Sequence, residues 1–291
     1  INYMPELPEV EVVKKSLERE LRSLTIKKVK IYDGNLRYKV KKQDFKKIIG
    51  LKILKIKRRS KYLLFFLSGN YLILAHLGMT GKFLILKKDN FKLKTSFYYQ
   101  TETLVNKHNR IQFFFNNKIR LIYNDVRKFG FIKFYDHDKY HENSHLRNLG
   151  PEPFEKKWNF EYFKKYIYGR NRNIKDILMD QKFIAGLGNI YVNEILFLSA
   201  IRPYRKVANL NNYEIDKIIK NTKIILKKSI KKGGSSIKDF SSDNGKKGNF
   251  QQYFKVYGKK GQKCSNTDCR SNIIKIVLSN RATFYCKKCQ K

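Results

Sequence analysis

The stretch Tyr62–Leu86 reads YLLFFLSGNYLILAHLGMTGKFLIL, and it decides the class of fold. It holds three short apolar runs, YLLFFL, YLILAHL and KFLIL. Short runs that are rich in aromatic and aliphatic residues and are bounded by polar residues or glycine are typical of β-strands. Five more such runs occur between residues 25 and 135: TIKKVKIY, LKILKIK, RIQFFF, IRLIY and FIKFY. The Asn116-Asn117 pair between RIQFFF and IRLIY predicts a hairpin turn.

One helix is expected before these strands. Within Glu9–Leu24 the apolar residues recur at steps of three and four, which places them in one stripe on a helix. The residues of the stripe are Val10, Val13, Leu17, Leu21 and Leu24. Many strands after a single helix predict a β-sandwich or barrel over residues 5–136.

The second half of the chain has a different character. Residues 137–157 are polar and contain the stretch GPEP, which predicts a linker. From Asn159 to Lys232 the periodicity is helical, and the Gly-rich stretch GGSSIKDFSSDNGKKGN then predicts a loop. The fold class expected is therefore an α+β multidomain protein. Its helical domain covers residues 158–249, and a cysteine-containing domain covers residues 250–291.

The composition is strongly basic. The 291 residues include 64 Lys+Arg and 24 Asp+Glu, which gives a formal net charge of +40. Such a charge favours a polyanionic partner such as nucleic acid, because each neutralised phosphate releases condensed counterions. Part of the lysine content has a second interpretation, since Lys, Asn, Ile, Phe and Tyr all have AT-rich codons.

The sequence also bounds the cellular location. No uninterrupted apolar stretch of about 18 residues occurs, so no membrane span is expected. The first residues are acidic, whereas a secretion signal begins with a basic region and continues with an apolar one. We therefore expect an intracellular, cytoplasmic protein, and nothing in the sequence indicates an oligomer, so a monomer is expected.

All four cysteines lie in the last 28 residues, with the spacing Cys264-x4-Cys269-x16-Cys286-x2-Cys289. Disulfides are disfavoured inside cells, and four thiolates at such spacings suit tetrahedral Zn²⁺. Free or disulfide-bonded cysteines are the alternative. A shell of four cysteines leaves no open coordination position, so one structural zinc ion is predicted.

At this point the residues resemble one family, the bacterial formamidopyrimidine-DNA glycosylases, which remove 8-oxoguanine and ring-opened purines from DNA. The matching stretches follow one another in family order along nearly the whole chain: MPELPEVE, RRSKYLLF, HLGMTGKF, NDVRKFG, HLRNLGPEP, LMDQKFIAGLGNIYVNEILF, GGSSIKDF, VYGKKGQKC and RATFYCKKCQK. The resemblance implies an N-terminal helix with a β-sandwich, a helix–two-turn–helix domain and a C-terminal zinc hairpin. It also implies base excision from double-stranded DNA containing oxidised purines, followed by strand cleavage.

The resemblance assigns Pro5 as the nucleophile. A free N-terminal proline is a secondary amine, and α-amino groups titrate near pH 8, so a lone pair is available to form a Schiff base with the sugar. Structurally, Pro5 and Pro8 could instead only start a helix. This sequence carries Ile1, Asn2 and Tyr3 before Met4, and an amide nitrogen cannot react in this way. We expect Pro5 to be the first residue of the active protein.

Two further residues match catalytic positions. Glu6 matches the general acid/base of the family, because a carboxylate beside the amine can move protons as the sugar ring opens. Glu9 and Glu11 are better explained as acids at a helix N-terminus, with a supporting role left open for Glu9. Lys61, in RRSKYLLF, matches a lysine implicated in base release and β-elimination. By composition alone, a lysine in this chain is a solvated surface charge.

Enzymes that act on a base in duplex DNA extrude the nucleotide, and side chains must fill the gap. The resemblance assigns this task to Met79, Arg127 and Phe129, although a buried Met or Phe is the ordinary alternative. Arg127 is expected to face the orphaned cytosine. The family commonly has Pro-Arg-Arg where this chain has Val126-Arg127-Lys128, so weaker backbone contacts are expected there.

The remaining DNA contacts implied by the resemblance are spread along the chain. Asn189 follows Gly188 at an expected helix start, where N–H groups bind phosphate, and it is otherwise a helix cap. Arg281 lies in the hairpin and is expected to grip phosphate and assist δ-elimination. The segment Ser241–Asn249 matches a base-capping loop. Further matches are Lys175, Arg170 and His108, the last in an unusually long loop over residues 88–109.

Two other functions are compatible with parts of the sequence. An endonuclease VIII-type glycosylase, which prefers oxidised pyrimidines, starts with PEGPE, whereas this chain has PELPE. A non-catalytic zinc-ribbon DNA-binding protein would explain the charge and the cysteines, and it is the alternative if Ile1–Tyr3 are retained. It would not explain Pro5, Glu6 and Lys61 in their motifs.

Overall fold

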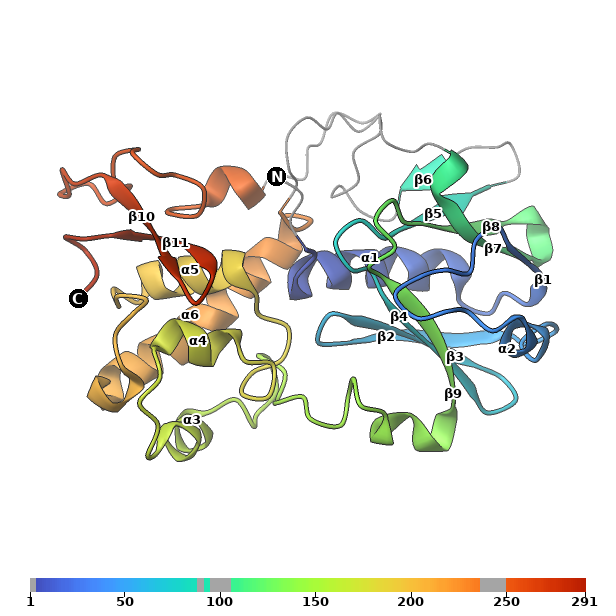
Figure 1. Ribbon diagram of the computed structural model, residues 1–291, viewed down its shortest axis with the longest axis horizontal. Coiled ribbons are helices and arrows are strands. Elements are labelled where there is room, and N and C mark those ends of the chain that lie inside the picture. The colour runs from blue at the N-terminus through green and yellow to red at the C-terminus, as the bar shows by residue number, and fades with distance from the viewer. Residues whose placement is uncertain (1–3, 88–91, 95–105, 236–249) are drawn as a thin grey trace. The chain divides into compact units, whose positions relative to one another are not determined.

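The structure is a computed structural model that describes residues 4–87, 92–94, 106–235 and 250–291. The chain folds into two compact units (Figure 1). The β unit comprises residues 1–147 and 232–249, and the helical unit comprises residues 148–231 and 250–291. Among the described residues, no helix is long and apolar enough to cross a bilayer.

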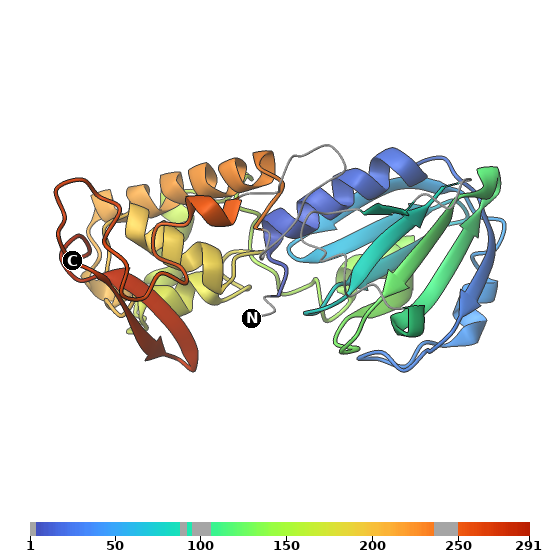
Figure 2. The same ribbon diagram turned by 90° about the horizontal axis from the view of Figure 1, so that it is seen from above.

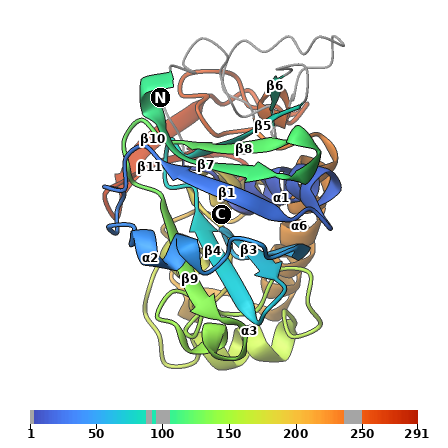
Figure 3. The same cartoon turned by 90° about the vertical axis from the view of Figure 1, so that its right-hand side faces the viewer.

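The β unit contains two antiparallel sheets, which Figure 3 shows as two layers. One has the strand order β1-β7-β8-β5-β6 and the other the order β2-β3-β4-β9. Its elements are α1 Leu7–Leu21, β1 Ile26–Ile31, α2 Lys42–Lys46, β2 Ile53–Arg59, β3 Tyr62–Leu67, β4 Tyr71–His76, β5 Lys82–Leu86, β6 Lys92–Lys94, β7 Asn109–Phe115, β8 Arg120–Asn124 and β9 Phe131–Asp136. Short 3-10 helices among the described residues of this unit are η2 Asn106–His108, η3 Asn116–Lys118 and η4 His137–Glu142. The prediction of a helix followed by a β-sandwich is confirmed.

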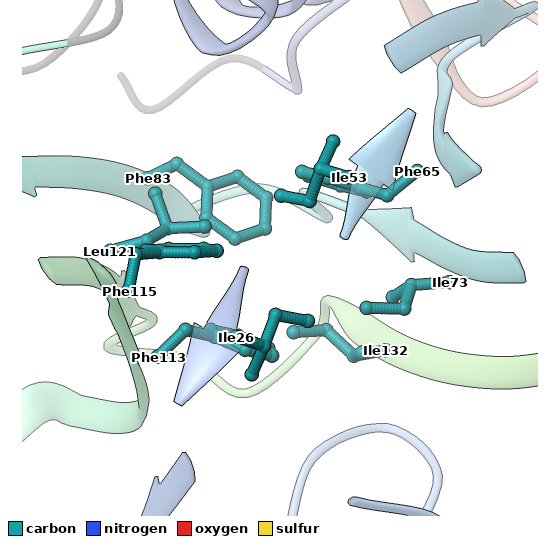
Figure 4. A pocket seen from close by; sticks show the side chains of 9 residues that line it. All are labelled: Ile26, Ile53, Phe65, Ile73, Phe83, Phe113, Phe115, Leu121 and Ile132. Carbon is teal, nitrogen blue, oxygen red and sulfur yellow. The ribbon is translucent and has the colours of Figure 1, made fainter. Parts of the chain in front are cut away.

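The core of the β unit lies between the sheets. Apolar side chains from both layers meet there and enclose a void of only about 10 Å³ (Figure 4). Such a void is at the lower limit for a single water molecule, and its lining is apolar, so the core is close-packed. The residues around it are Ile26, Ile53, Phe65, Ile73, Phe83, Phe113, Phe115, Leu121 and Ile132.

Helix α1 starts two residues earlier than predicted and ends three residues earlier. Its first turn is fixed by a capping box, in which the Glu6 backbone N–H donates to the Glu9 carboxylate (3.0 Å). The chain leaves the helix at Ser23, whose φ is +67°. The predicted stripe is buried from Val10 to Leu21, and the helix packs along β2 (Figure 2).

The hairpin predicted at Asn116-Asn117 is confirmed. Strands β7 and β8 pair antiparallel, and η3 connects them. Asn117 has a φ of +61°, a left-handed conformation that asparagine tolerates better than most residues.

The helical unit is built around one buried helix. Its elements are α3 Phe160–Ile167, α4 Ile174–Met179, α5 Asn189–Leu198, η5 Val207–Asn209, α6 Asn212–Lys231, η6 Phe250–Tyr253, β10 Ile273–Leu278 and β11 Arg281–Cys286. Every residue of α5 from Ile190 to Phe197 is buried. Figure 1 shows the hairpin β10–β11 beside α5 within this unit.

The unit boundaries differ from the expected domains within the linker and after α6. Residues 137–147, expected as linker, belong to the β unit. Residues 148–157, expected as linker, pack in the helical unit: Gly150 donates to the Gln181 carbonyl (2.8 Å), and a side chain at Gly150 would collide with the Phe183 carbonyl. Residues 232–235, expected with the helices, belong to the β unit, because Gly234 and Ser235 close around Glu9.

Glu194 on α5 anchors the segment that leads to the cysteines. Its carboxylate is almost completely buried and accepts hydrogen bonds from the backbone N–H groups of Lys255 (2.8 Å), Val256 (3.0 Å) and Tyr257 (2.8 Å). Burial raises the pKa of this carboxyl, and the three donors counteract the rise. The segment 255–257 is therefore tied to the centre of the unit.

We expect Glu194→Ala to destabilise the helical unit by about 3 kcal/mol or more, because each buried donor left without a partner costs about 1–3 kcal/mol. Urea unfolding followed by the fluorescence of Trp158, the single tryptophan and a fully buried residue of this unit, measures the change. Glu161→Ala, which removes an exposed carboxylate on α3, is the control. Equal midpoints for the two variants would contradict the anchoring role.

Candidate nucleic-acid interface and catalytic residues

The start of α1 brings Pro5, Glu6 and Glu9 together in the β unit, and all three are buried. One Glu9 oxygen caps the Glu6 N–H, and the other accepts from the backbone N–H (2.7 Å) and the hydroxyl (2.8 Å) of Ser235. Gly234 has a φ of +83° and packs against Glu9. Glu9 is thus occupied with fixing the loop that leads to the predicted base-capping segment, which lies outside the described residues.

Lys61 lies in the turn between β2 and β3 and is half-buried. Its neighbour Tyr62 pairs with His76 across the sheet, with ring centroids 5.0 Å apart. Burial, reinforced by the charge of Lys61, lowers the pKa of His76 to about 3, so its imidazole is neutral near pH 7. The structure therefore places a neutral histidine beside the predicted catalytic lysine.

Sequence reasoning missed His76, although it lies in the quoted motif HLGMTG. Its Nδ1 accepts a hydrogen bond from the Gly78 N–H (3.1 Å). A neutral imidazole whose Nδ1 accepts must carry its proton on Nε2. The hydrogen bond from Gly78 therefore places the proton of the neutral His76 ring on Nε2. The signal available in the sequence was its position two residues before Gly78.

The structure brings the three predicted void-filling residues together. Met79 lies in the turn between β4 and β5, and Arg127 and Phe129 lie between β8 and β9. The Arg127 Nη1 is 3.2 Å from the Met79 Sδ, and its guanidinium lies 4.5 Å from the centroid of the Phe129 ring. Phe129 is 45% exposed. An exposed aromatic ring beside an arginine and a thioether suits insertion between bases.

Lys128, where the family commonly has a second arginine, is directed to Asp33. Its ammonium lies 2.7 Å from the Asp33 Oδ2, which Arg110 also contacts at 2.9 Å. The hydrogen bond from Lys128 is the largest cause of the lowered pKa of Asp33. This ion pair ties the loop between β8 and β9, which carries Arg127 and Phe129, to Asp33.

His108 ends η2, directly before β7, and its carbonyl accepts the backbone N–H of Asp125 (3.0 Å). Its pKa is lowered by burial and by three nearby cations. The cations that lower this pKa are Arg110, Lys107 and Lys82. The bond to Asp125 joins His108 to the loop that carries Arg127.

In the helical unit, Lys175 and Asn189 hold the tip of the hairpin β10–β11. The Lys175 Nζ donates to the Thr283 hydroxyl (2.6 Å), and the Asn189 amide donates to the Ala282 carbonyl (2.9 Å). Lys175 is 1% exposed, and burial lowers its pKa to about 8, with the charge of Arg281 acting in the same direction. The lysine predicted to contact DNA is therefore almost completely buried, and its ammonium is hydrogen-bonded to the hairpin.

A second residue of α5, Asn193, was not found from the sequence. Its side-chain oxygen accepts the backbone N–H of Phe284 (2.7 Å). Together with Asn189 it fixes two consecutive turns of α5 to strand β11. The spacing of four residues in NIYVN was the available signal.

Arg281 faces a depression of about 320 Å³. Its other charged lining residues are Arg172, Lys175, Asp176 and Asp180. Arg172 is paired with Asp180 (3.1 Å), whereas the side chain of Arg281 is exposed at the hairpin tip. This arrangement suits an anion held by Arg281.

Arg170 lies apart from this depression, in the loop after α3. Its Nε donates to the Tyr166 carbonyl (2.5 Å), and its guanidinium lies 4.5 Å from the centroid of the Tyr166 ring. The residue is exposed. The contact of Arg170 with DNA stays a prediction.

The four cysteines meet at one point. Their Sγ atoms all lie within 4.8 Å of one another, with 3.8 Å between Cys264 and Cys289 and 3.6 Å between Cys269 and Cys286. A tetrahedral zinc ion with Zn–S bonds of about 2.3 Å has S–S edges of about 3.8 Å. The donor set and its geometry therefore fit a metal ion.

The chain is similar to known proteins along nearly its whole length. Residues 4–132 match the model of the formamidopyrimidine-DNA glycosylase N-terminal domain, and residues 149–241 match that of the formamidopyrimidine-DNA glycosylase H2TH domain. A formamidopyrimidine-DNA glycosylase of Rickettsia bellii (strain OSU 85-389) is 39% identical over 99% of this chain and 100% of its own length. One of Rickettsia massiliae is 40% identical over 99% of this chain and 97% of its own length.

Solved structures agree with the sequence comparisons. Lactococcus lactis Fpg in complex with DNA containing an abasic site superposes with a TM-score of 0.85 at 33% identity, over 98% of this chain and 99% of that one. The wild-type Lactococcus lactis Fpg (MutM) in complex with DNA containing N7-benzyl-Fapy-dG also gives a TM-score of 0.85 at 33% identity, over 99% of this chain and 100% of that one. The chain therefore belongs to the formamidopyrimidine-DNA glycosylase family.

Proposed function

We propose that this protein is a base-excision repair enzyme that removes 8-oxoguanine and formamidopyrimidines from double-stranded DNA and then cleaves the strand by β,δ-elimination. The observation that carries the proposal is the buried pair Pro5–Glu6 at the start of α1. A buried carboxylate next to a potential N-terminal amine is the arrangement that Schiff-base chemistry at a sugar requires.

The first step forms a bond between the Pro5 nitrogen and C1′ of the damaged nucleotide. The bond from C1′ to the base breaks, and its electron pair leaves with the base, which takes up a proton. Glu6 donates a proton to the ring oxygen as the sugar opens, so that an iminium remains on C1′. This step requires that Pro5 be the first residue of the active protein.

Elimination follows from the iminium. Loss of a proton from C2′ expels the 3′-phosphate, and a second elimination expels the 5′-phosphate. Both leaving groups are anionic, so Lys61, the Nε2–H of His76 and Arg281 are the groups that would stabilise them. A water molecule from the solvent then hydrolyses the remaining iminium, which restores the Pro5 amine and releases the sugar fragment as an aldehyde.

Met79, Arg127 and Phe129, which lie against one another, would fill the gap that the extruded nucleotide leaves. Arg127 offers several N–H donors to the cytosine that remains in the stack. The cysteines Cys264, Cys269, Cys286 and Cys289 would hold one structural zinc ion, which fixes the base of the hairpin that carries Arg281. We place this activity in the cytoplasm of a bacterium, where the DNA lies.

We expect Glu6→Gln to lower the rate of 8-oxoguanine excision by about 10²-fold or more, because it removes the proton-transfer group. Binding to the same duplex should change little, because the amide keeps the shape of the side chain. Single-turnover excision and a filter-binding assay measure the two properties. Glu11→Gln, on the same helix but paired with Arg58, is the matched control. Excision by Glu6→Gln at the wild-type rate would rule out the assignment.

Borohydride trapping tests the nucleophile directly. The protein is prepared with and without Ile1–Met4 and mixed with a duplex that contains 8-oxoguanine opposite cytosine. We expect a covalent protein–DNA band only from the form that starts at Pro5. A duplex containing thymine glycol instead of 8-oxoguanine separates the endonuclease VIII-type alternative. Absence of any band with either form would favour the non-catalytic DNA-binding alternative.

Removal of the metal is expected to weaken DNA binding before it affects the β unit. Chelation should lower the affinity for an 8-oxoguanine duplex by about 10-fold or more, since it releases the base of the hairpin that carries Arg281. Zinc content is measured together with affinity. Metal-free protein that binds with unchanged affinity would contradict the role of the hairpin.

A further inference from the structure

Asp125 is a completely buried carboxylate that the catalytic proposal does not use. It lies at the start of the loop that carries Arg127 and Phe129. Its Oδ1 accepts the Thr80 hydroxyl (2.5 Å), and its Oδ2 accepts the Gly130 backbone N–H (2.9 Å) and the Tyr123 hydroxyl (3.3 Å). The carboxylate therefore closes its own loop and reaches a second loop, 45 residues earlier in the chain.

Thr80 links the two loops through one hydroxyl group. It follows Met79 directly, donates its proton to Asp125, and accepts the backbone N–H of Arg127 (3.0 Å). Met79, which precedes Thr80 in the chain, and Arg127, whose N–H binds the Thr80 hydroxyl, are both predicted void-filling residues. A hydroxyl that donates once and accepts once in a buried place fixes both of its partners.

Glycines allow the two backbones to touch. A Cβ on Gly78 would lie 2.5 Å from the Gly130 nitrogen and 2.5 Å from the Phe129 carbonyl carbon, and Gly78 has a φ of +61°. A Cβ on Gly130 would lie 1.9 Å from the Tyr123 hydroxyl. Side chains are excluded from this contact, so the loops pack backbone against backbone.

This construction matters because, of the side chains that it supports, Arg127 and Phe129 are exposed and Met79 is half-buried. Insertion into a duplex orders exposed side chains and loops, and that ordering costs free energy unless the loops are already fixed. Two independent turns would each be ordered separately. Two turns that are joined through a buried carboxylate are ordered together before DNA binds, so the free-energy cost of ordering them on insertion is smaller.

We propose that Asp125 and Thr80 are positioning residues that couple the turn of Met79 to the loop of Arg127 and Phe129, so that the three side chains enter the duplex together. The proposal rests on the proposed function of these three residues. It predicts a defect in base extrusion and not in the chemistry at Pro5 and Glu6.

The test uses Thr80→Val, which keeps the branched shape but removes the hydroxyl, and Thr80→Ser, which restores the hydroxyl. We expect Thr80→Val to lower single-turnover excision of 8-oxoguanine by about 10²-fold. Cleavage of a preformed abasic site should change by less than about 3-fold, because an abasic nucleotide has no base to unstack and its sugar reaches the reacting groups without help from the void-filling side chains. Thr80→Ser should recover most of the excision rate. Circular dichroism and thermal unfolding verify that the full-length variants are folded.

Binding is followed separately with a duplex that carries an uncleavable tetrahydrofuran abasic analogue and an adjacent 2-aminopurine. Insertion of the side chains unstacks the 2-aminopurine and raises its fluorescence, and Thr80→Val should abolish this rise at saturating protein. This readout needs no catalysis. It therefore tests the coupling even if the wild-type protein cleaves neither the 8-oxoguanine duplex nor the abasic duplex. Such a lack of cleavage would overturn the proposed function and leave the coupling to be decided by the fluorescence.

Two results would overturn the coupling. In the first, Thr80→Val retains wild-type excision and the fluorescence rise. In the second, excision and abasic-site cleavage fall by the same factor and Thr80→Ser does not restore them, which would reduce Thr80 and Asp125 to a general role in stability.

Discussion

Hydrogen bonds from loops to buried carboxylates are the interaction on which the rest of this structure depends. Glu9, Asp125 and Glu194 are each almost completely buried, and each accepts backbone N–H groups from a loop. A carboxylate is costly to bury, and donors that point at it offset the cost while fixing its position. These three residues fix the loop after Lys232, the two loops that carry Met79 and Phe129, and the segment before the cysteines.

The same use of acids leaves still fewer carboxylates at the surface of an already basic chain. Only 24 acidic residues face 64 basic ones, and several of those acids are inside the protein, where they hold loops and cannot neutralise surface lysines. The positive surface is therefore compatible with an ordered interior. A polyanion such as duplex DNA meets cations whose counterions it can release.

The sequence predicted the elements that depend on local pattern. The stripe of α1, the turn at Asn116-Asn117 and the four-cysteine cluster all follow from spacing within short segments. The positions of Met79, Arg127 and Phe129 came from the resemblance, and the structure brings them together.

The sequence could not predict contacts between distant segments. Glu9 and Ser235 are 226 residues apart, and Asn193 and Phe284 are 91 apart, so no local pattern relates them. Lys175 shows the same limit: its motif identified the residue, but its burial depends on the hairpin that folds over it. His76 was missed because its environment comes from the neighbouring strand β3.

The hairpin β10–β11 is held by different groups at its base and at its tip. At its base, Cys286 belongs to the cysteine cluster, and its N–H donates to Gln290, whose amide in turn donates to the Ile201 carbonyl (2.7 Å). At its tip, Lys175 and the asparagines of α5 hold residues 282–284. A metal ion at the base can set the direction of the strands, but a two-stranded ribbon twists and bends along its length. The side chains from α4 and α5 therefore determine where the tip lies. The hairpin that carries Arg281 is thus held at both ends, at its base through Cys286 and at its tip by side chains of α4 and α5.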